Sequence, residues 1–302
     1  MWENDGTTSF EDDLDTSSFP THGSNIAYDN VAVVNGEIIV SFTPAVAHAN
    51  RFLRDASGLG QTYVELAAPT VTTSPVRIAF DGTLYLAATG GGGGSVYTTD
   101  DLDNPWSSSV GICPTDYFYR TASDLKGTVV ASGDRRSAKH DDVRVTSSGG
   151  AVWASVTPFT GADPDVWGVY WSESRQLFIA VGTKDDGFST DNDGAIATSP
   201  DGLTWTELSP VVNFNGKSPQ TLWGIEQIGE VGGVLVALVR DNQFGTNLRL
   251  AASLDGVSWR VLMDRTTDDS AQYLATGDTG LLMASQESAG TGACYISNRA
   301  SL

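Results

Sequence analysis

The sequence has little lysine, little cysteine and no long apolar run. Only 4 of its 17 basic residues are lysine, whereas 37 residues are acidic, so the formal net charge is −20. Binding a polyphosphate or an anionic membrane surface needs a basic face, and we expect neither nucleic acid nor membrane lipid as a partner. No window approaches 18 consecutive apolar residues, which predicts that the chain does not insert into a membrane.

The two cysteines, Cys113 and Cys294, form no zinc-binding or redox spacing. The first ten residues have neither the basic segment nor the apolar segment of a secretion signal. Both observations predict synthesis in a reducing cytoplasm, with two buried thiols. A single disulfide between Cys113 and Cys294 is the alternative.

A recurrent aromatic-tipped segment organises the 302-residue chain. Tyr63, Trp106, Trp153, Trp205 and Trp259 end such segments, and they lie 43, 47, 52 and 54 residues apart. A period of about 40–50 residues built from short strands is the signature of a β-propeller blade. Since 40% of the residues are apolar, the chain has enough hydrophobic side chains to fill the cores of such blades.

Each period also holds two short apolar runs separated by a turn, as in residues 166–171 and 176–181. Such runs are typical of strands buried on both faces. No stretch has helical periodicity, and the second run recurs in six units that start near residues 26, 74, 116, 165, 220 and 271. We therefore predict an all-β fold, a single β-propeller over residues 26–302 with six blades of four antiparallel strands. Seven blades are the alternative.

Residues 1–25 differ from the rest of the chain. Between residues 3 and 25 there are six acidic and no basic residues, and such a composition cannot bury much apolar surface alone. We predict an acidic N-terminal arm that is a solvated tail; an arm that docks a partner protein with a basic groove is the functional alternative. The last unit stops at Leu302 before its outer strand, so the arm, through Trp2, is also expected to complete the last blade. A three-stranded last blade is the competing reading.

Two segments match S-x-D-G-x-[TS]-W closely, and they comprise Ser199, Asp201, Gly202, Trp205, Ser253, Asp255, Gly256 and Trp259. This element resembles the Asp-box, or BNR repeat, of sialidases, sortilin-type receptors, photosystem assembly propellers and some glycoside hydrolases. The resemblance implies a turn between the third and fourth strands of a blade, remote from the central binding face. In such a turn the Asp carboxylate accepts backbone N–H bonds, Gly supplies a positive φ, and Trp packs between blades. We expect a structural role for all eight residues.

Sialidase chemistry requires three arginines around a carboxylate, a Tyr nucleophile assisted by a Glu, and an acidic acid/base group. The resemblance places the first arginine in an Arg-Ile-Pro motif, and its nearest echo is Arg77-Ile-Ala79, without the proline. Arg120 and either Arg175 or Arg240 would have to converge with Arg77, but none has a recognisable context. We therefore predict no catalytic residues, with a sialidase-like glycoside hydrolase as the alternative function.

Three tryptophans are candidates for a ligand site. Trp167, Trp171 and Trp223 head the presumed inner strands, with Trp167-Gly168 and Trp223-Gly224 at matching places. Because inner strands line the central channel, the three rings are candidates for a sugar-stacking platform at one face. Packing between blades is the interpretation that we favour.

Asp185, Asp186, Asp191 and Asp193 form the densest group of carboxylates, in a Gly-containing loop. Ca²⁺ takes six to eight oxygen ligands, but the spacing fails the EF-hand template. A solvated acidic loop without metal is expected, and Ca²⁺ is the alternative.

The chain as a whole resembles sialidase-like phage proteins that lack the catalytic set. That resemblance implies a non-enzymatic structural and binding propeller of a phage virion, in the tail or surface apparatus, made in the host cytoplasm. Its expected partners are other virion proteins, reached through the N-terminal arm, and a host glycan. A cellular assembly-factor propeller, similar to those of photosystem biogenesis, is the remaining alternative, although the basic patch usual there is not evident in this sequence.

Overall fold

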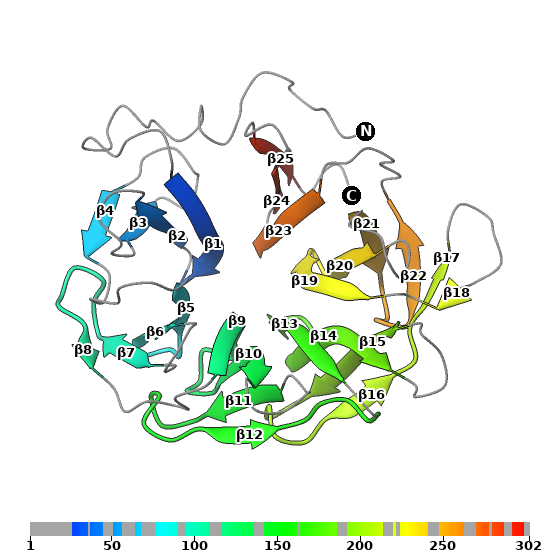
Figure 1. Ribbon diagram of the computed structural model, residues 1–302, viewed down its shortest axis with the longest axis horizontal. Coiled ribbons are helices and arrows are strands. Elements are labelled where there is room, and N and C mark those ends of the chain that lie inside the picture. The colour runs from blue at the N-terminus through cyan, green and yellow to red at the C-terminus, as the bar shows by residue number, and fades with distance from the viewer. Residues whose placement is uncertain are drawn as a thin grey trace.

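The computed structural model describes residues 26–35, 37–44, 51–55, 64–67, 76–89, 95–108, 116–135, 142–161, 164–185, 192–213, 220–221, 224–240, 248–262, 270–277, 280–286 and 292–298. Within them every regular element is a β-strand, and the strands form six sheets arranged around a central axis (Figure 1). No helix among these residues has the length and apolarity needed to cross a membrane. The predicted N-terminal arm, residues 1–25, and its closure of the ring lie outside the described residues.

Four of the sheets contain four strands each, antiparallel and in sequence order. The first comprises β1 (Ile26–Val34), β2 (Glu37–Pro44), β3 (Arg51–Asp55) and β4 (Val64–Ala67). The second comprises β5 (Val76–Phe80), β6 (Tyr85–Thr89), β7 (Val96–Thr99) and β8 (Ser107–Ser108). The third comprises β9 (Asp116–Ser123), β10 (Val129–Arg135), β11 (Asp142–Thr146) and β12 (Ala154–Val156). The fourth comprises β13 (Asp165–Ser172), β14 (Leu177–Asp185), β15 (Asn192–Ser199) and β16 (Thr206–Leu208).

The fifth sheet has six strands and the sixth has three among the described residues. The fifth comprises β17 (Val211–Asn213), β18 (Gln220–Thr221), β19 (Ile225–Val231), β20 (Val234–Arg240), β21 (Leu248–Ser253) and β22 (Ser258–Val261). At its outer edge β17 pairs in parallel with β22, and β18 pairs antiparallel with β17. The sixth comprises β23 (Ser270–Gly277), β24 (Gly280–Gln286) and β25 (Gly292–Asn298).

In each blade, the first strand of the antiparallel meander lies nearest the axis. These inner strands, β1, β5, β9, β13, β19 and β23, contact one another in turn, and β23 also contacts β1, so the ring returns on itself (Figure 1). Antiparallel order places the turns between first and second strands, and between third and fourth strands, at one end of the axis. We call that end the turn face and the opposite end the loop face. The prediction of an all-β, six-bladed propeller is confirmed.

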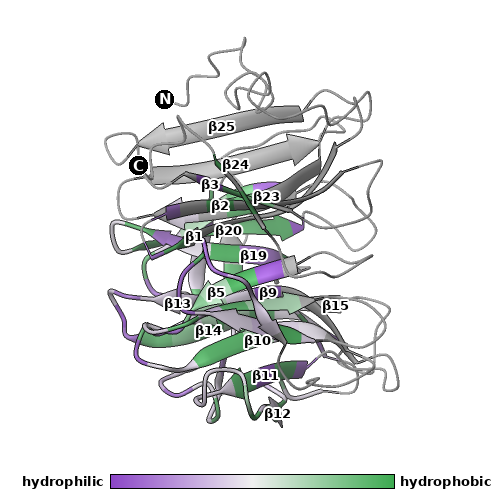
Figure 2. Ribbon diagram, turned by 90° about the vertical axis from the view of Figure 1, so that its left-hand side faces the viewer, coloured by the Kyte–Doolittle hydropathy of each residue, from purple (hydrophilic) through white to green (hydrophobic). Residues whose placement is uncertain are grey.

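Hydrophobic side chains fill the spaces between neighbouring sheets. One cluster joins Ile179 of β14 and Ile225 of β19 with Trp259 of β22, and a second joins Val130 of β10 with Phe178 of β14. In side view the hydrophobic colour is concentrated within the strands, for example in β10 and β20 (Figure 2). Each fully buried side chain of this size contributes about 1.5–3 kcal/mol, so the blades hold together chiefly through these shared cores.

Candidate functional site

Five of the six inner strands contain a one-residue β-bulge in the half nearer the loop face. The register of each strand with its neighbour skips one residue, and the skipped residues are Asp29, Tyr119, Trp167, Glu226 and Gln272. A bulge bends the strand and re-aims a side chain, and bulges are frequent beside binding sites. The loop-face ends of the inner strands are therefore the part of this ring best suited to hold a ligand.

Two of these bulge residues, from adjacent blades, share a third side chain. Arg240, the last residue of β20, has its Cζ 4.2 Å from the centroid of the Trp167 ring. Its Nε and Nη2 lie 2.6 and 2.5 Å from Oε1 of Glu226. Gly224 permits this close packing, because a Cβ at that position would lie 2.9 Å from the Trp167 ring. We call Trp167, Glu226 and Arg240 the Trp167 site.

The Trp167 site combines fixed geometry with access to solvent. The side chains of Arg240 and Glu226 are 35% and 25% exposed, and Trp167 is half-buried. A guanidinium stacked on an indole and held by a carboxylate keeps its remaining N–H donors in a fixed plane. The site can therefore offer donors, an acceptor and an aromatic surface to a neutral polar ligand.

Trp171 lies at the other end of β13, toward the turn face. Its ring centroid is 4.7 Å from that of Phe178, and its Nε1 donates to Oε2 of Glu173 at 2.7 Å. It packs against the cluster between the third and fourth sheets. The structure thus does not bring Trp167 and Trp171 together, and Trp223 lies outside the described residues.

The S-x-D-G-x-T-W segment of the fourth sheet forms the turn between β15 and β16. Oγ of Ser199 accepts the N–H of Gly202 at 2.8 Å, and Oδ1 of Asp201 accepts the N–H of Thr204 at 2.8 Å. Gly202 has φ 75°, and its carbonyl accepts a bond from Nε1 of Trp205 at 2.7 Å. The hydrogen bonds that the Asp201 carboxylate accepts in this turn, that from the Thr204 N–H foremost, lower the pKa of Asp201.

The equivalent segment of the fifth sheet repeats the same geometry between β21 and β22. Oγ of Ser253 accepts the N–H of Gly256 at 2.9 Å, and Oδ1 of Asp255 accepts that of Ser258 at 2.7 Å. Nε1 of Trp259 donates to the Gly256 carbonyl at 2.9 Å, and Gly256 has φ 77°. The backbone N–H bond from Ser258, followed by others in the turn, lowers the pKa of Asp255 to about 2.

A looser copy in the third sheet keeps the tryptophan bond and changes the rest. Nε1 of Trp153 donates to the carbonyl of Gly150 at 2.9 Å, and Gly150 has φ 82°. Hydroxyls take the places of the Ser and Asp oxygens: Oγ1 of Thr146 accepts the N–H of Gly150 at 3.3 Å, and Oγ of Ser148 accepts that of Val152 at 3.1 Å. The tryptophan and the glycine therefore define the turn more strictly than the carboxylate does.

The arginines considered for sialidase chemistry lie at different heights along the ring axis. Arg77 is the second residue of β5, near the loop face, whereas Arg120 is further along β9, opposite Ser132. Arg240 lies at the loop face, and Arg175 lies in the β13–β14 turn at the turn face. An eight-residue strand such as β13 is about 26 Å long, so Arg175 cannot converge with Arg77, and of the two alternatives for the third arginine only Arg240 lies at the loop face.

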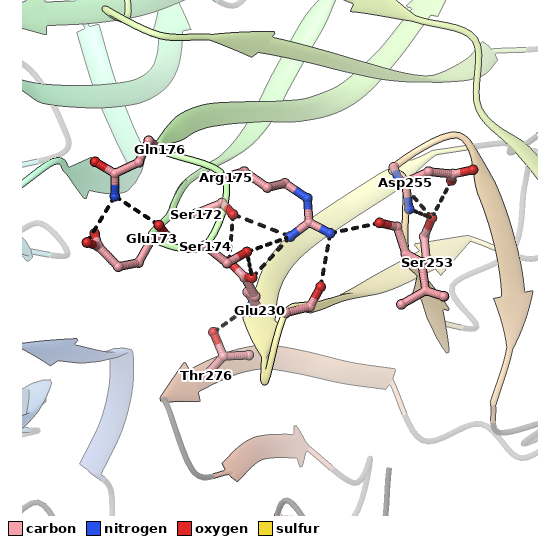
Figure 3. Close-up of polar contacts among 12 residues, drawn as sticks. Ser172, Glu173, Ser174, Arg175, Gln176, Glu230, Ser253, Asp255 and Thr276 are labelled. Atoms are coloured by element: carbon pink, nitrogen blue, oxygen red, sulfur yellow. Dashed lines mark hydrogen bonds and ion pairs between the residues drawn. The ribbon is translucent and has the colours of Figure 1, made fainter.

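Arg175 instead joins adjacent blades at the turn face (Figure 3). Its Nη1 lies 3.1 Å from Oε1 of Glu230, a carboxylate whose side chain is 7% exposed. Its Nη2 donates to the carbonyl oxygens of Gly233 and Leu254 at 3.0 and 2.9 Å. One guanidinium of the fourth sheet thus holds two separate turns of the fifth.

Glu230 extends this network to a third blade. Its carboxylate accepts hydrogen bonds from Ser172, at 2.6 Å, and from Ser174. Its backbone N–H donates to Oγ1 of Thr276 in the sixth sheet at 3.2 Å (Figure 3). We call Arg175, Glu230, Ser172, Ser174 and Thr276 the Arg175 cluster. The hydrogen bonds and the ion pair described for this cluster join residues of different blades. The cluster therefore has a structural role.

A further ion pair lies at the loop end of the fourth sheet. Nζ of Lys184 contacts Oε1 of Glu207, whose Oε2 accepts the N–H and the hydroxyl of Thr160 at 3.0 and 2.7 Å. Burial raises the pKa of Glu207, but the bonds from Lys184 and Thr160 outweigh it, and the pKa falls below its usual value. Glu207 is thereby unsuited to act as a general acid near neutral pH.

The acidic group expected in the fourth sheet falls at the edge of the described residues. β14 ends at Asp185 and Asp193 belongs to β15, while Asp186 and Asp191 lie between them. None of the four side chains is among those the structure describes. Among the side chains that are described, no three His, Cys, Asp or Glu residues gather as a metal site would require.

The sequence pattern alone did not reveal the partners of Trp167. Glu226 and Arg240 lie 59 and 73 residues further along the chain (226 − 167 and 240 − 167) and carry no motif. The available signal was the recurrence of a polar or aromatic residue early in each inner strand. This signal can be interpreted only when the position of the bulge is known. Trp167 in β13 and Glu226 in β19 are equivalent because each is the residue that its strand's register skips.

No family model matches the chain, and no curated protein matches it. Among solved structures, the Hadza microbial sialidase Hz136 has a TM-score of 0.61 at 15% identity, covering 93% of this chain and 67% of the sialidase. YCF48 bound to D1 peptide has a TM-score of 0.55 at 14% identity, with 93% and 82% covered. The six-bladed fucose-recognising lectin of the fungus Aleuria aurantia has a TM-score of 0.55 at 13% identity, with 92% and 93% covered. At these identities the similarities establish the fold, a sialidase-like β-propeller shared by binding proteins and hydrolases.

Proposed function

We propose that this chain is a non-catalytic binding propeller of a phage virion, which contacts neighbouring virion proteins and binds a host glycan at the Trp167 site. The observation that carries the glycan part is the meeting of two bulge residues, Trp167 and Glu226, through Arg240 at the loop face. Ligand sites favour concave places where strands end, as at the mouths of β-barrels, and the loop-face ends of the inner strands are such a place in this ring.

The chemistry of the Trp167 site fits a sugar. Vicinal hydroxyls each donate and accept hydrogen bonds, which matches a guanidinium beside a carboxylate. The C–H face of a pyranose packs on an aromatic ring, and the part of the half-buried Trp167 indole that the stacked Arg240 leaves uncovered is proposed as that surface. Since Arg240 and Glu226 already neutralise each other, a neutral or weakly charged sugar is favoured over an anion.

Two features support a binding role over hydrolysis. Arg175, one of the two alternatives for the third arginine of a sialidase, lies at the turn face and joins blades there, while the other, Arg240, is stacked on Trp167 and paired with Glu226. Most glycoside hydrolases other than sialidases also need two carboxyl groups about 5–9.5 Å apart at the scissile bond. Glu226 is instead paired with Arg240, and Glu207 with Lys184.

The virion location rests on the resemblance to sialidase-like phage proteins and on the strongly acidic composition. Fixed turns of the Asp-box type, at Asp201 and Asp255, suit a rigid structural subunit. The N-terminal arm, residues 1–25, is proposed as one of the segments that contact neighbouring subunits.

Glycan binding is tested on an array of bacterial lipopolysaccharide and capsular oligosaccharides, followed by calorimetry with each hit. We expect Trp167→Ala, Arg240→Gln and Glu226→Gln each to weaken binding at least tenfold. Arg260→Gln, an exposed arginine of β22, is the matched control and should bind like wild type. Equal binding by all four variants would reject the Trp167 site.

Two measurements test the other parts of the proposal. Aryl glycosides, including an aryl sialoside, should show no turnover above background; turnover that Arg240→Gln abolishes would establish an enzyme instead. Mass spectrometry of purified particles should detect the chain, with cross-links to neighbouring subunits. Its absence from particles, despite expression in infected cells, would reject the virion location.

A further inference from the structure

Large aliphatic side chains are exposed on the turn face of three consecutive blades. Val152, Leu203 and Leu254 are 72%, 52% and 77% exposed, and each lies in the turn between the third and fourth strands of its sheet. Leu125, 51% exposed, lies in the β9–β10 turn of the same face. We call these four residues the apolar arc. They are four of the seven large exposed hydrophobic residues that the structure describes.

Turn geometry directs these side chains outward, but sequence decides what they are. In S-x-D-G-x-[TS]-W the serine, aspartate and tryptophan bond to the turn itself, so Leu203 and Leu254, at x positions, face away from it. The corresponding turn of the second sheet buries its leucine, Leu102, and exposes Asp100 and Asp103. Among the turns between third and fourth strands that the structure describes, the apolar arc is therefore confined to the third, fourth and fifth sheets. Isolated exposed leucines are ordinary, whereas exposed aliphatic side chains in the equivalent turns of three consecutive blades are not.

The surface that carries the arc is pre-organised. Arg175 holds the carbonyl of Leu254, and Nζ of Lys126 donates to Oε1 of Gln176 at 2.6 Å across the third and fourth sheets. A Cβ at Gly202 would lie 2.8 Å from Val130 of the third sheet, so this turn is seated directly on its neighbour. A rigid surface loses little conformational entropy when a partner docks.

Charges beside the arc identify the kind of partner. Asp201, Asp255 and Glu173 are exposed on the same face, and turn bonds keep the first two ionised. Arg175 is already paired with Glu230, and the one charge of Lys126, which donates to the neutral Gln176, is outnumbered by these three carboxylates. A second copy of this face would oppose carboxylate to carboxylate, whereas lysine and arginine on a different protein would complement it.

We propose that the apolar arc is a docking surface for a protein partner that presents apolar side chains flanked by lysine and arginine. The inference rests on the proposed function only in that the partner is a neighbouring protein. It concerns the face opposite the Trp167 site, so glycan binding and partner docking fail separately.

The probe is a 15-residue peptide of alternating lysine and leucine, with a glutamate–leucine peptide of equal length as the charge-reversed comparison. We expect the lysine peptide to bind, to weaken with salt, and to protect amides of residues 148–153, 200–204 and 254–257 in hydrogen exchange. Leu203→Ser combined with Leu254→Ser should weaken binding about tenfold or more at unchanged net charge. Both side chains are exposed, so the double variant should keep wild-type stability.

Leu262→Ser, at the far end of β22, is the matched control and should bind like wild type. The proposal is overturned if the double variant binds the lysine peptide as tightly as wild type, if the glutamate peptide binds equally, or if protection falls elsewhere. A wild-type homodimer that the double variant dissolves would assign the arc to self-association, and would equally overturn it. Glycan binding should be unaffected in every variant used here.

Discussion

Replacing Arg175 with methionine should destabilise the ring, because it removes the guanidinium that joins the fourth sheet to two turns of the fifth. The substitution keeps the length of the side chain and removes all donors. It leaves the Glu230 carboxylate, 7% exposed, with serine hydroxyls but no cation. Breaking a buried ion pair from one side costs about 3–5 kcal/mol. Because the Arg175 side chain is 21% exposed, we expect the lower end, about 3 kcal/mol.

Denaturant unfolding of a double-mutant cycle separates this pair from its surroundings. Glu230→Gln keeps an acceptor for the serines and should cost about 1–2 kcal/mol. The double variant should be less damaged than the sum of the two, with a coupling energy of at least about 1 kcal/mol. Arg260→Met, an exposed arginine, is the control and should stay within about 0.5 kcal/mol of wild type. The assigned role would be refuted if Arg175→Met left the free energy of unfolding unchanged, or if the losses of the two single variants added up to that of the double variant.

Three further predictions concern single positions. Asp255 has its pKa lowered from 3.8 to about 2 in the folded chain, so its charge stabilises the fold above about pH 4 and ceases to do so as pH falls toward 2; the stability deficit of Asp255→Asn should shrink over that interval in pH-dependent denaturation. Gly182→Ala places a Cβ 1.8 Å from the Asp165 carbonyl oxygen and should cost several kcal/mol, whereas Gly233→Ala, at φ +87° with open space, should cost only about 1 kcal/mol in thermal melts. Trp259→Phe removes the 2.9 Å bond to the Gly256 carbonyl and part of a buried ring, and should lose about 2 kcal/mol in denaturant titration.

The sequence was sufficient for the fold because the fold signals are local. A strand needs only a short apolar run, and the turn ending in Trp205 or Trp259 is specified by seven successive residues. The runs at 166–171 and 176–181 accordingly correspond to β13 and β14, displaced by a few residues at their ends. Because these apolar runs and turns recur at a near-constant period, they predict repeated sheets that bury their faces against one another in a ring.

The site was less predictable because its determinants are relations between blades. Trp167-Gly168 and Trp223-Gly224 look equivalent as letters, yet Trp167 is the third residue of β13 and β19 begins only at Ile225. The bulge makes Glu226, and not the second tryptophan, the counterpart of Trp167. Neither a one-residue bulge nor a stacking contact formed across a blade boundary, such as that of Arg240 on Trp167, leaves a trace in a single sequence.

The β17–β18 hairpin gives the ring a mark of orientation. A partner can bind a propeller of near-identical blades in several rotational orientations that differ little in binding free energy. By lying along β22 the hairpin makes one rim segment unlike the others among the described strands. A neighbouring protein that binds the outer edge of the ring would therefore contact one distinct blade, and would bind in a single rotational orientation.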